Sequence, residues 1–360
     1  MNEPEPAAIK RSDENEYGLT RDIPNDVARQ VRQRDGFGCV ICGSAFYTYD
    51  HFDPEFVDAE KHDLHGICLL CGTCHRRKTS GLLSTESVKE VVLHPKCKET
   101  GFSWGALDVG NEHPEIILGS FTAYKIKVLI EIYGEEIFSV LPPENPGGPY
   151  RINALLTDPD GKPILKIIEN EWRTSSENWD VELVGPRMTV RRNLGEIIMI
   201  LRSEPPHRLV VARLQMQHRG TTIQAQDGRD IIVRTAEGAE FKGYGYRGEE
   251  CAVGIRVSTS GLAIGVGCKG GSISSGSIRA PEAPGARLGR NAACWCRSGL
   301  KASAVTEGSF NRDGIRVYCT AMGSIKPGSL FLTFRRARSP ASTYQTAIAR
   351  RSASLGLGCS

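Results

Sequence analysis

Two C-x-x-C pairs in the first hundred residues constrain this chain more than any other feature. They are Cys39 with Cys42 and Cys71 with Cys74. A tight turn in each pair directs two thiolates at one ion, and two pairs complete a tetrahedral all-sulfur site. Two separate redox dithiols are the alternative, but two pairs in one short stretch favour a shared zinc ion. Such a closed site stabilises the fold and takes no part in a reaction, and Cys68 is expected to be a packed core thiol.

The residues around the two pairs follow a recognisable order. Tyr49-Asp50-His51 lies between the pairs, and the second pair continues into His75 and a basic run. This order resembles the HNH endonuclease family, in which C-x-x-C is followed by Asp-His and then by Leu-Cys-x-x-Cys-His-x-x-Lys. The segment R-Q-R-D-G-F-G-C-V-I-C-G at residues 32–43 also resembles the entry to such a module. The resemblance covers residues 24–85 and implies a zinc-stabilised ββα-metal fold.

The resemblance also implies a reaction and a role for each residue. Hydrolysis of a phosphodiester requires a base that activates water and a cation that neutralises charge on the phosphate. His51 would be the general base, because a neutral imidazole accepts a proton near pH 7. Asp50 and His75 would bind Mg²⁺ or a similar divalent cation. Contacts with backbone phosphates are expected from Arg76, Arg77 and Lys78.

The match departs from the family at one position. The family has an Asn a few residues before Leu-Cys that orients the base, and this position falls on Gly66. No Asn occurs between His51 and His75. His62, Asp63 or His65 could orient His51, and His62 or His65 could instead bind the metal. Loss of such an orienting group typically costs about 10- to 100-fold in activity, so an impaired module that binds nucleic acid without cutting it is the alternative.

The remaining organisation follows from hydrophobic periodicity and turn residues. We expect a loose polar tail over residues 1–22, an HNH-type domain over 23–85 that begins with a helix at 25–34 capped by Asn25, and a linker over 86–119. A β-rich, sandwich-like domain of unknown function is expected over 120–278. Its predicted strands are residues 125–132, 137–141, 151–156, 163–168, 179–183, 187–192, 197–202, 209–216 and 231–234. The fold class is therefore α+β. In a third hypothesis this β-rich domain recognises a ligand and the zinc module is an accessory.

A second cysteine motif lies near the C-terminus. Residues 289–301, G-R-N-A-A-C-W-C-R-S-G-L-K, resemble the SEC-C zinc motif, in which Cys294 and Cys296 would be two of four ligands. The following residues, 302–308, supply no further ligand, so this partial motif over 279–301 would leave both cysteines orphaned. A frameshift near Lys301 would explain the missing half and would make residues 302–360, an expected disordered tail, an out-of-frame peptide.

Composition sets the expected surroundings and partners. The net charge is +3, but residues 302–360 carry a surplus of six positive charges, which leaves the first 301 residues at −3. Binding of nucleic acid must therefore depend on local patches. The sequence has no apolar run of membrane-spanning length and no secretory h-region, so we expect a cytoplasmic protein without a membrane partner. Nucleic acid, DNA ahead of RNA, is the expected partner.

Overall fold

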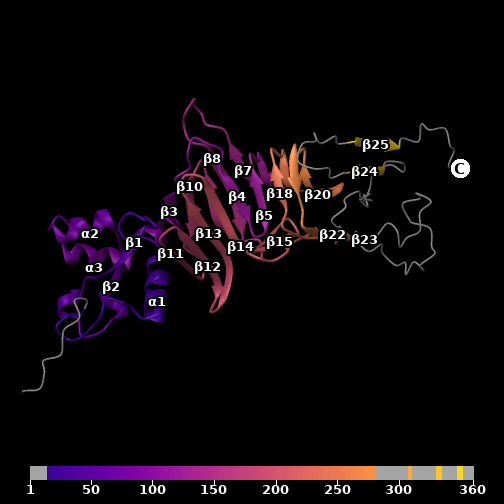
Figure 1. Cartoon of the computed structure of the whole chain (residues 1–360). Coiled ribbons are helices and arrows are strands. Elements are labelled where there is room, and N and C mark those ends of the chain that lie inside the picture. The colour runs from indigo at the N-terminus through magenta and orange to yellow at the C-terminus, as the bar shows by residue number, and fades with distance from the viewer. Residues whose placement is uncertain (1–13, 280–306, 310–329, 335–346, 352–360) are drawn as a thin grey trace, which may run out of the picture. The chain divides into compact units, whose positions relative to one another are not determined.

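The structure is a computed structural model that describes residues 14–279, 307–309, 330–334 and 347–351 (Figure 1). The fold is mixed α+β and rich in strands, which confirms the expected class. The chain forms two compact units. Unit 1 comprises Met1–Ala106, Glu171–Gly185 and Thr189–Glu196, and unit 2 comprises Leu107–Asn170, Pro186–Met188 and Ile197–Ser360.

Unit 1 contains the α-helices of the described residues. They are α1 (Asn25–Asp35), α2 (Gly72–Thr79), α3 (Thr85–Leu93) and α4 (Lys96–Thr100), with the short 3-10 helices η1 (Phe56–Asp58) and η2 (Leu64–Gly66). Its strands are β1 (Tyr47–His51), β2 (Ile67–Cys71), β3 (Phe102–Ala106), β10 (Glu171–Ser175) and β11 (Asp180–Val184). The boundary with unit 2 falls within β12 (Arg187–Asn193) and at the start of β13 (Glu196–Glu204).

An antiparallel hairpin of β1 and β2 forms the centre of the N-terminal module. All five residues of β2 are buried, because each face of the strand packs against a helix. Ile67 and Leu69 pack against Val31 of α1 on one face. Leu70 packs against Val88 of α3 on the other. Figure 1 shows the same helices beside the hairpin in the indigo part of the chain.

The first helix lies where the sequence predicts it. The expected helix over residues 25–34 is α1, and Gly36 ends it in the left-handed conformation at φ 75°. The expected N-cap differs, because Asn25 is the first helical residue and Pro24 occupies the cap position without a side-chain hydrogen bond. Proline suits this end of a helix, where no N–H donor is needed.

The segment that we expected to be a linker, residues 86–119, is instead structured. It contains most of α3 and all of α4, β3 and β4. Ser84 caps α3 by accepting a hydrogen bond from the Ser87 amide at 3.1 Å. Val88 and Cys97 are fully buried. These apolar side chains lose contact with water only when the segment packs on the module, which explains why it does not remain a linker.

The expected N-terminal tail is also partly ordered. Residues 1–13 lie outside the described residues, but Asn15 is buried. Its side-chain amide donates hydrogen bonds to the carbonyl oxygens of Phe56, at 2.7 Å, and Ala59, at 2.6 Å. These bonds connect residues 14–22 to the loop between β1 and β2.

Unit 1 extends beyond the expected domain boundary at residue 85. Strand β3 pairs antiparallel with β10, which lies in a later part of the chain. Arg32 of α1 forms a two-pronged hydrogen bond to Asp180 of β11, with distances of 2.8 and 3.0 Å. Both side chains are at least 95% buried, so residues 171–196 complete unit 1 rather than belonging to a separate β-rich domain.

Most of the described strands of unit 2 lie in two sheets. One sheet has the strand order β20-β19-β6-β7-β8-β9, and the other has the order β21-β18-β5-β4-β14-β15-β16-β17-β22 with β13 also paired to β14. The pairs β4 with β14, β5 with β18 and β6 with β19 are parallel.

The strands of the first sheet are β6 (Val128–Ile132), β7 (Glu135–Leu141), β8 (Arg151–Thr157), β9 (Pro163–Ile168), β19 (Val253–Ser258) and β20 (Gly261–Val266). Those of the second are β4 (Glu115–Leu118), β5 (Phe121–Tyr124), β14 (Arg208–His218), β15 (Thr221–Gln226), β16 (Ile231–Arg234), β17 (Glu240–Tyr244), β18 (Arg247–Glu249), β21 (Gly270–Ser272) and β22 (Ser275–Arg279).

A disulfide joins Cys251 and Cys268 in unit 2. The two cysteines flank the β19–β20 hairpin, in which Val253 is opposite Val266. Each cysteine lies two residues beyond this pair, so the strand register brings them opposite each other.

Most of the C-terminal region lies outside the described residues. This applies to the partial zinc motif with Cys294 and Cys296, and to nearly all of the expected tail over 302–360. Within that tail the structure describes only β23 (Glu307–Ser309), β24 (Leu330–Phe334) and β25 (Ala347–Arg351). None of the helices in the described part of the chain has the length and apolar character needed to span a bilayer.

Candidate metal centre and adjoining site

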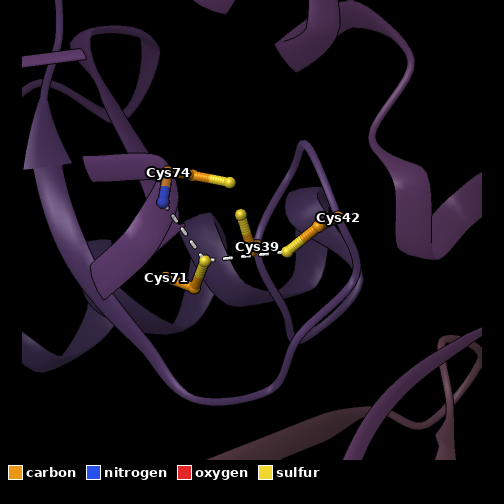
Figure 2. Close-up of side chains that lie close together, drawn as sticks. All are labelled: Cys39, Cys42, Cys71 and Cys74. Carbon is orange, nitrogen blue, oxygen red and sulfur yellow. Dashed lines mark hydrogen bonds between the residues drawn. The ribbon is translucent and has the colours of Figure 1, made fainter. Parts of the chain in front are cut away.

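The four cysteines of the two C-x-x-C pairs form one cluster. Cys39 and Cys42 lie in the loop after α1, Cys71 ends β2, and Cys74 lies in the first turn of α2. Their sulfur atoms lie within 4.8 Å of one another, and Figure 2 shows the four side chains converging. The sulfurs of Cys42 and Cys71 are 3.6 Å apart. Tetrahedral zinc with Zn–S bonds of about 2.3 Å separates its sulfurs by about 3.8 Å, so the cluster fits a zinc ion.

The backbone around the four cysteines is arranged so that their sulfurs can bind a metal ion. The amide of Cys74 points at the Cys71 sulfur at 3.4 Å, which caps α2 (Figure 2). Gly43 turns the first loop with φ 80°, and its amide donates to the Cys39 carbonyl at 2.8 Å. A hydrogen bond from Cys42 lowers the pKa of the Cys39 thiol. The turn therefore favours a thiolate, which is the form that binds metal.

The cluster is closed and structural in character. Cys39, Cys71 and Cys74 are buried and Cys42 is exposed. Cys68 is fully buried in the neighbouring apolar core, and burial raises the pKa of its thiol, as expected for a packed residue. Within the part of the chain that the structure describes, no other set of three or more His, Cys, Asp or Glu side chains brings its ligand atoms together in this way.

Asp50 and His75 meet beside the cluster. Asp50 lies on β1 and His75 in the first turn of α2, and their Oδ1 and Nε2 atoms are 3.1 Å apart. The Asp50 side chain is only 6% exposed. Its other oxygen, Oδ2, has no hydrogen-bond partner among the described residues. A buried carboxylate beside an imidazole is a donor set that fits a divalent cation.

Lys78 belongs to this same group rather than to an outer phosphate-binding face. Its ammonium is 3.0 Å from Asp50 Oδ2 and 3.8 Å from Glu55 Oε1, and its side chain is 8% exposed. The contact with Asp50 lacks hydrogen-bond geometry and is electrostatic. From the sequence we expected Lys78 to contact phosphate together with Arg76 and Arg77, and its contact with Asp50 was not predicted. The spacing of three residues between His75 and Lys78, which puts both on one face of a helix, was the available signal.

Arg76 and Arg77 are placed differently from Lys78. Both are exposed on α2. Neither side chain has an ion pair or hydrogen bond to another residue that the structure describes. Two exposed guanidinium groups without a described partner, in the same helix as His75, can contact an anion.

His51 has a histidine partner. Its Nε2 atom is 3.0 Å from Nδ1 of His62, and its ring contacts the edge of Phe56. Burial, followed by the nearby His62, lowers the pKa of His51 to about 4. His51 is therefore neutral at pH 7. His65, the other candidate for orienting His51, is exposed, and its imidazole has no partner among the described residues.

Asp50 and His51 leave β1 on opposite sides, because successive residues of a strand point to opposite faces. Asp50 points to the α2 side, where it contacts His75 and Lys78. His51 is on the face of Tyr49, whose hydroxyl accepts from Arg32 of α1. The two expected cation ligands, Asp50 and His75, therefore lie together, and His51 lies on the other face of β1.

Gly66, which stands where the resemblance predicts an Asn, has no room for a side chain. A Cβ atom at Gly66 would overlap the carbonyl oxygen of Asp53. The Gly66 carbonyl accepts from the amides of Phe52, at 2.9 Å, and Asp53, at 3.4 Å. This backbone contact holds the chain immediately after His51.

Comparisons with models of protein families, with characterised proteins and with solved structures gave no match for this chain. Any functional conclusion therefore depends on the residues and their geometry.

Proposed function

We propose that this chain is a metal-dependent endonuclease that hydrolyses phosphodiester bonds of nucleic acid, with DNA as the expected substrate. Residues 23–85 would be a four-cysteine HNH module, in which β1, β2 and α2 form the ββα-metal fold. The observation that carries the proposal is the 3.1 Å approach of Asp50 to His75 beside a cysteine cluster suited to zinc. Two side chains far apart in the sequence thus meet where the motif requires them.

Asp50 and His75 would hold the divalent cation. Oδ1 of Asp50 lies 3.1 Å from Nε2 of His75, and Oδ2 lies 3.0 Å from the Lys78 ammonium, so a bound cation would share this carboxylate with Lys78. Two protein ligands leave further positions for water and phosphate oxygens. The cation, when bound, would neutralise negative charge on the phosphate and on the leaving oxygen.

His51 would accept the proton from the attacking water. His62 forms a hydrogen bond with the backbone of Thr20. Its Nδ1 atom lies 3.0 Å from Nε2 of His51. If His62 donates its Nε2 proton to Thr20, its Nδ1 accepts from Nε2 of His51. The Nδ1 atom of His51 then keeps a free lone pair and can act as the base. His62 would therefore position the base in place of the family's Asn.

In an in-line displacement the attacking and leaving oxygens lie on opposite sides of phosphorus. The phosphate would therefore have to reach both His51 and the pair of Asp50 and His75, and it would meet them at the end of β1, where His51 is the last residue. Arg76 and Arg77, exposed and unpaired among the described residues, would hold neighbouring phosphates.

The second candidate function is binding of nucleic acid without cleavage. The observation that favours it is Gly66 at the position of the orienting Asn, because glycine supplies no side-chain hydrogen bond. Under this alternative the cysteine cluster and the two arginines keep their roles, and His51 has none.

Plasmid nicking separates the two candidates. We expect the wild-type chain to nick supercoiled DNA with Mg²⁺ or Mn²⁺, and His51→Ala to lose about 100-fold or more of this activity. His62→Ala should lose about 10- to 100-fold. His65→Ala is the matched control, because its imidazole is exposed and without a described partner, and it should retain full activity. Equal rates for wild type and His51→Ala would reject the nuclease assignment.

A further inference from the structure

A cleft of about 680 Å³ opens beside His51 on the α1 side of the hairpin. Side chains that contribute to its walls include Arg21, Tyr49, His51, Phe56 and Glu182. Its volume lies within the range of about 300–1,000 Å³ that is usual for small-ligand sites. The cleft therefore leads to the proposed base from the side opposite Asp50 and His75.

An aromatic wall lines part of this cleft. The Phe56 ring lies edge-on to His51, with centroids 5.3 Å apart. The Arg21 guanidinium lies over the Phe56 ring, 4.4 Å from its centroid, and so covers one face of the ring with its own plane. Arginine planes and aromatic rings are the surfaces on which unpaired nucleic-acid bases stack.

The charges of the cleft do not suit an anion alone. Its lining contains two arginines and two carboxylates: Arg21, Arg32, Asp22 and Glu182. Arg32 is neutralised by its buried contact with Asp180. A phosphate would therefore meet no excess of basic groups here. A flat, uncharged group with donors and acceptors on its edge fits the walls better.

We propose that this cleft holds one nucleobase next to the phosphate that is cut. This inference rests on the proposed nuclease function, because a strand with its phosphate at His51 carries a nucleoside into the adjoining space. A base within the cleft cannot also be stacked and paired in a duplex. The preferred substrate is therefore single-stranded, or contains an unpaired nucleotide at the cleavage position.

Binding in buffer without added Mg²⁺ or Mn²⁺ tests the cleft while leaving the strand uncut. The probes are a fluorescein-labelled single-stranded DNA and a blunt duplex of the same sequence, followed by anisotropy. We expect the single strand to bind about tenfold or more tightly than the duplex, since the duplex must first release a base. Phe56→Leu should weaken single-strand binding by about 5- to 100-fold, because leucine has no stacking plane. Arg21→Gln should weaken it in the same direction.

Arg29→Gln is the matched control. Arg29 lies over the Trp179 ring at 5.5 Å, a similar contact outside the residues that line the cleft, so its loss should change affinity by less than about twofold. Phe56→Tyr keeps a stacking plane and should restore binding if Phe56→Leu loses it. Equal binding by wild type, Phe56→Leu and Arg21→Gln would overturn the proposal, as would equal affinity for the two probes. Phe56-dependent single-strand binding without any cleavage would keep the base site and reject the nuclease.

Discussion

Gly66 has no room for a side chain, so this position cannot supply a side chain that would orient His51, the proposed general base. A Cβ there would overlap the Asp53 carbonyl oxygen. We therefore expect Gly66→Asn, which restores the family residue, to destabilise unit 1 by about 1–3 kcal/mol and to give no gain in nicking. Urea unfolding and the plasmid assay measure the two effects.

Gly72→Ala is the control for Gly66→Asn. A Cβ at Gly72 meets no atom within 4 Å, and the residue is the first of α2. Alanine should therefore leave the free energy of unfolding unchanged or raise it by up to about 1 kcal/mol. Higher activity in Gly66→Asn, with stability unchanged, would contradict the steric account.

Lys78 is expected to compensate the buried charge of Asp50. Both side chains are less than a tenth exposed, with Nζ 3.0 Å from Oδ2. Lys78→Met should destabilise unit 1 by about 3–5 kcal/mol, because the carboxylate loses its cationic partner. Mn²⁺ should raise the melting temperature of this variant more than that of wild type, since the ion replaces the lost charge.

Differential scanning fluorimetry with and without Mn²⁺ measures this difference. The control is Lys89→Met, because Lys89 and Asp53 form an exposed pair at 2.7 Å, and such pairs contribute about 0–1 kcal/mol. The same Mn²⁺ shift in wild type and Lys78→Met would argue against a cation at Asp50.

Among the elements, those with a local signal were predictable from the sequence. The predicted strands over residues 163–168 and 231–234 match β9 and β16 in their bounds, because each is an apolar, β-branched run ended by turn residues. Helix α3 was missed although its signal is present: Ser84 caps it. Strand β3 was also missed, since its pairing with β10 depends on a distant segment that no local pattern reveals.

The same difference between local and distant signals applies to the candidate site. Regular spacing predicted the cysteine cluster, whose sulfurs do converge. The choice between His62 and His65 was left open by the sequence, because it depends on how the loop between β1 and β2 folds back. The contact between His51 and His62 is set by that loop.

Removal of zinc should unfold the hairpin and α2 while leaving unit 2 folded. Cys71 ends β2 and caps α2, so the cluster connects both elements. We expect about one zinc per chain in wild type and its loss in Cys42→Ser, with reduced helical circular dichroism, because zinc binding supplies much of the folding free energy of such modules. Cys68→Val should keep its zinc, since Cys68 is a core residue outside the cluster. Zinc retained at the wild-type level in Cys42→Ser would contradict the assignment of this ligand.

At the scale of the whole molecule, the two units were harder to predict than their elements. The sequence indicated a zinc module followed by a β-rich region; the structure has a cluster of four cysteines that could hold a metal ion, and it is rich in strands. It did not indicate that the chain leaves unit 1 after Ala106 and returns at Glu171. This return depends on side chains that are distant in sequence and buried together. Local patterns in successive segments give no information about such pairs.

Asp180 is the residue through which this return can be tested. It binds Arg32 through both oxygens, and Oδ2 also accepts from Arg191 at 2.9 Å. Asp180→Asn leaves the buried Arg32 guanidinium with only its longer contact to Glu182, at 3.5 Å, so unit 1 should lose about 3–5 kcal/mol. Amides of α1 and β11 should then exchange hydrogen faster by mass spectrometry.

The matched control lies in unit 2, where Glu131 and Arg256 form a two-pronged contact at 2.7 and 3.1 Å. Arg256 is 36% exposed, so water and salt screen this pair and Glu131→Gln should cost less than about 1 kcal/mol. If Asp180→Asn changed exchange no more than Glu131→Gln does, the segment over residues 171–196 would contribute little to the stability of unit 1. The N-terminal residues alone would then be sufficient for the zinc module to fold.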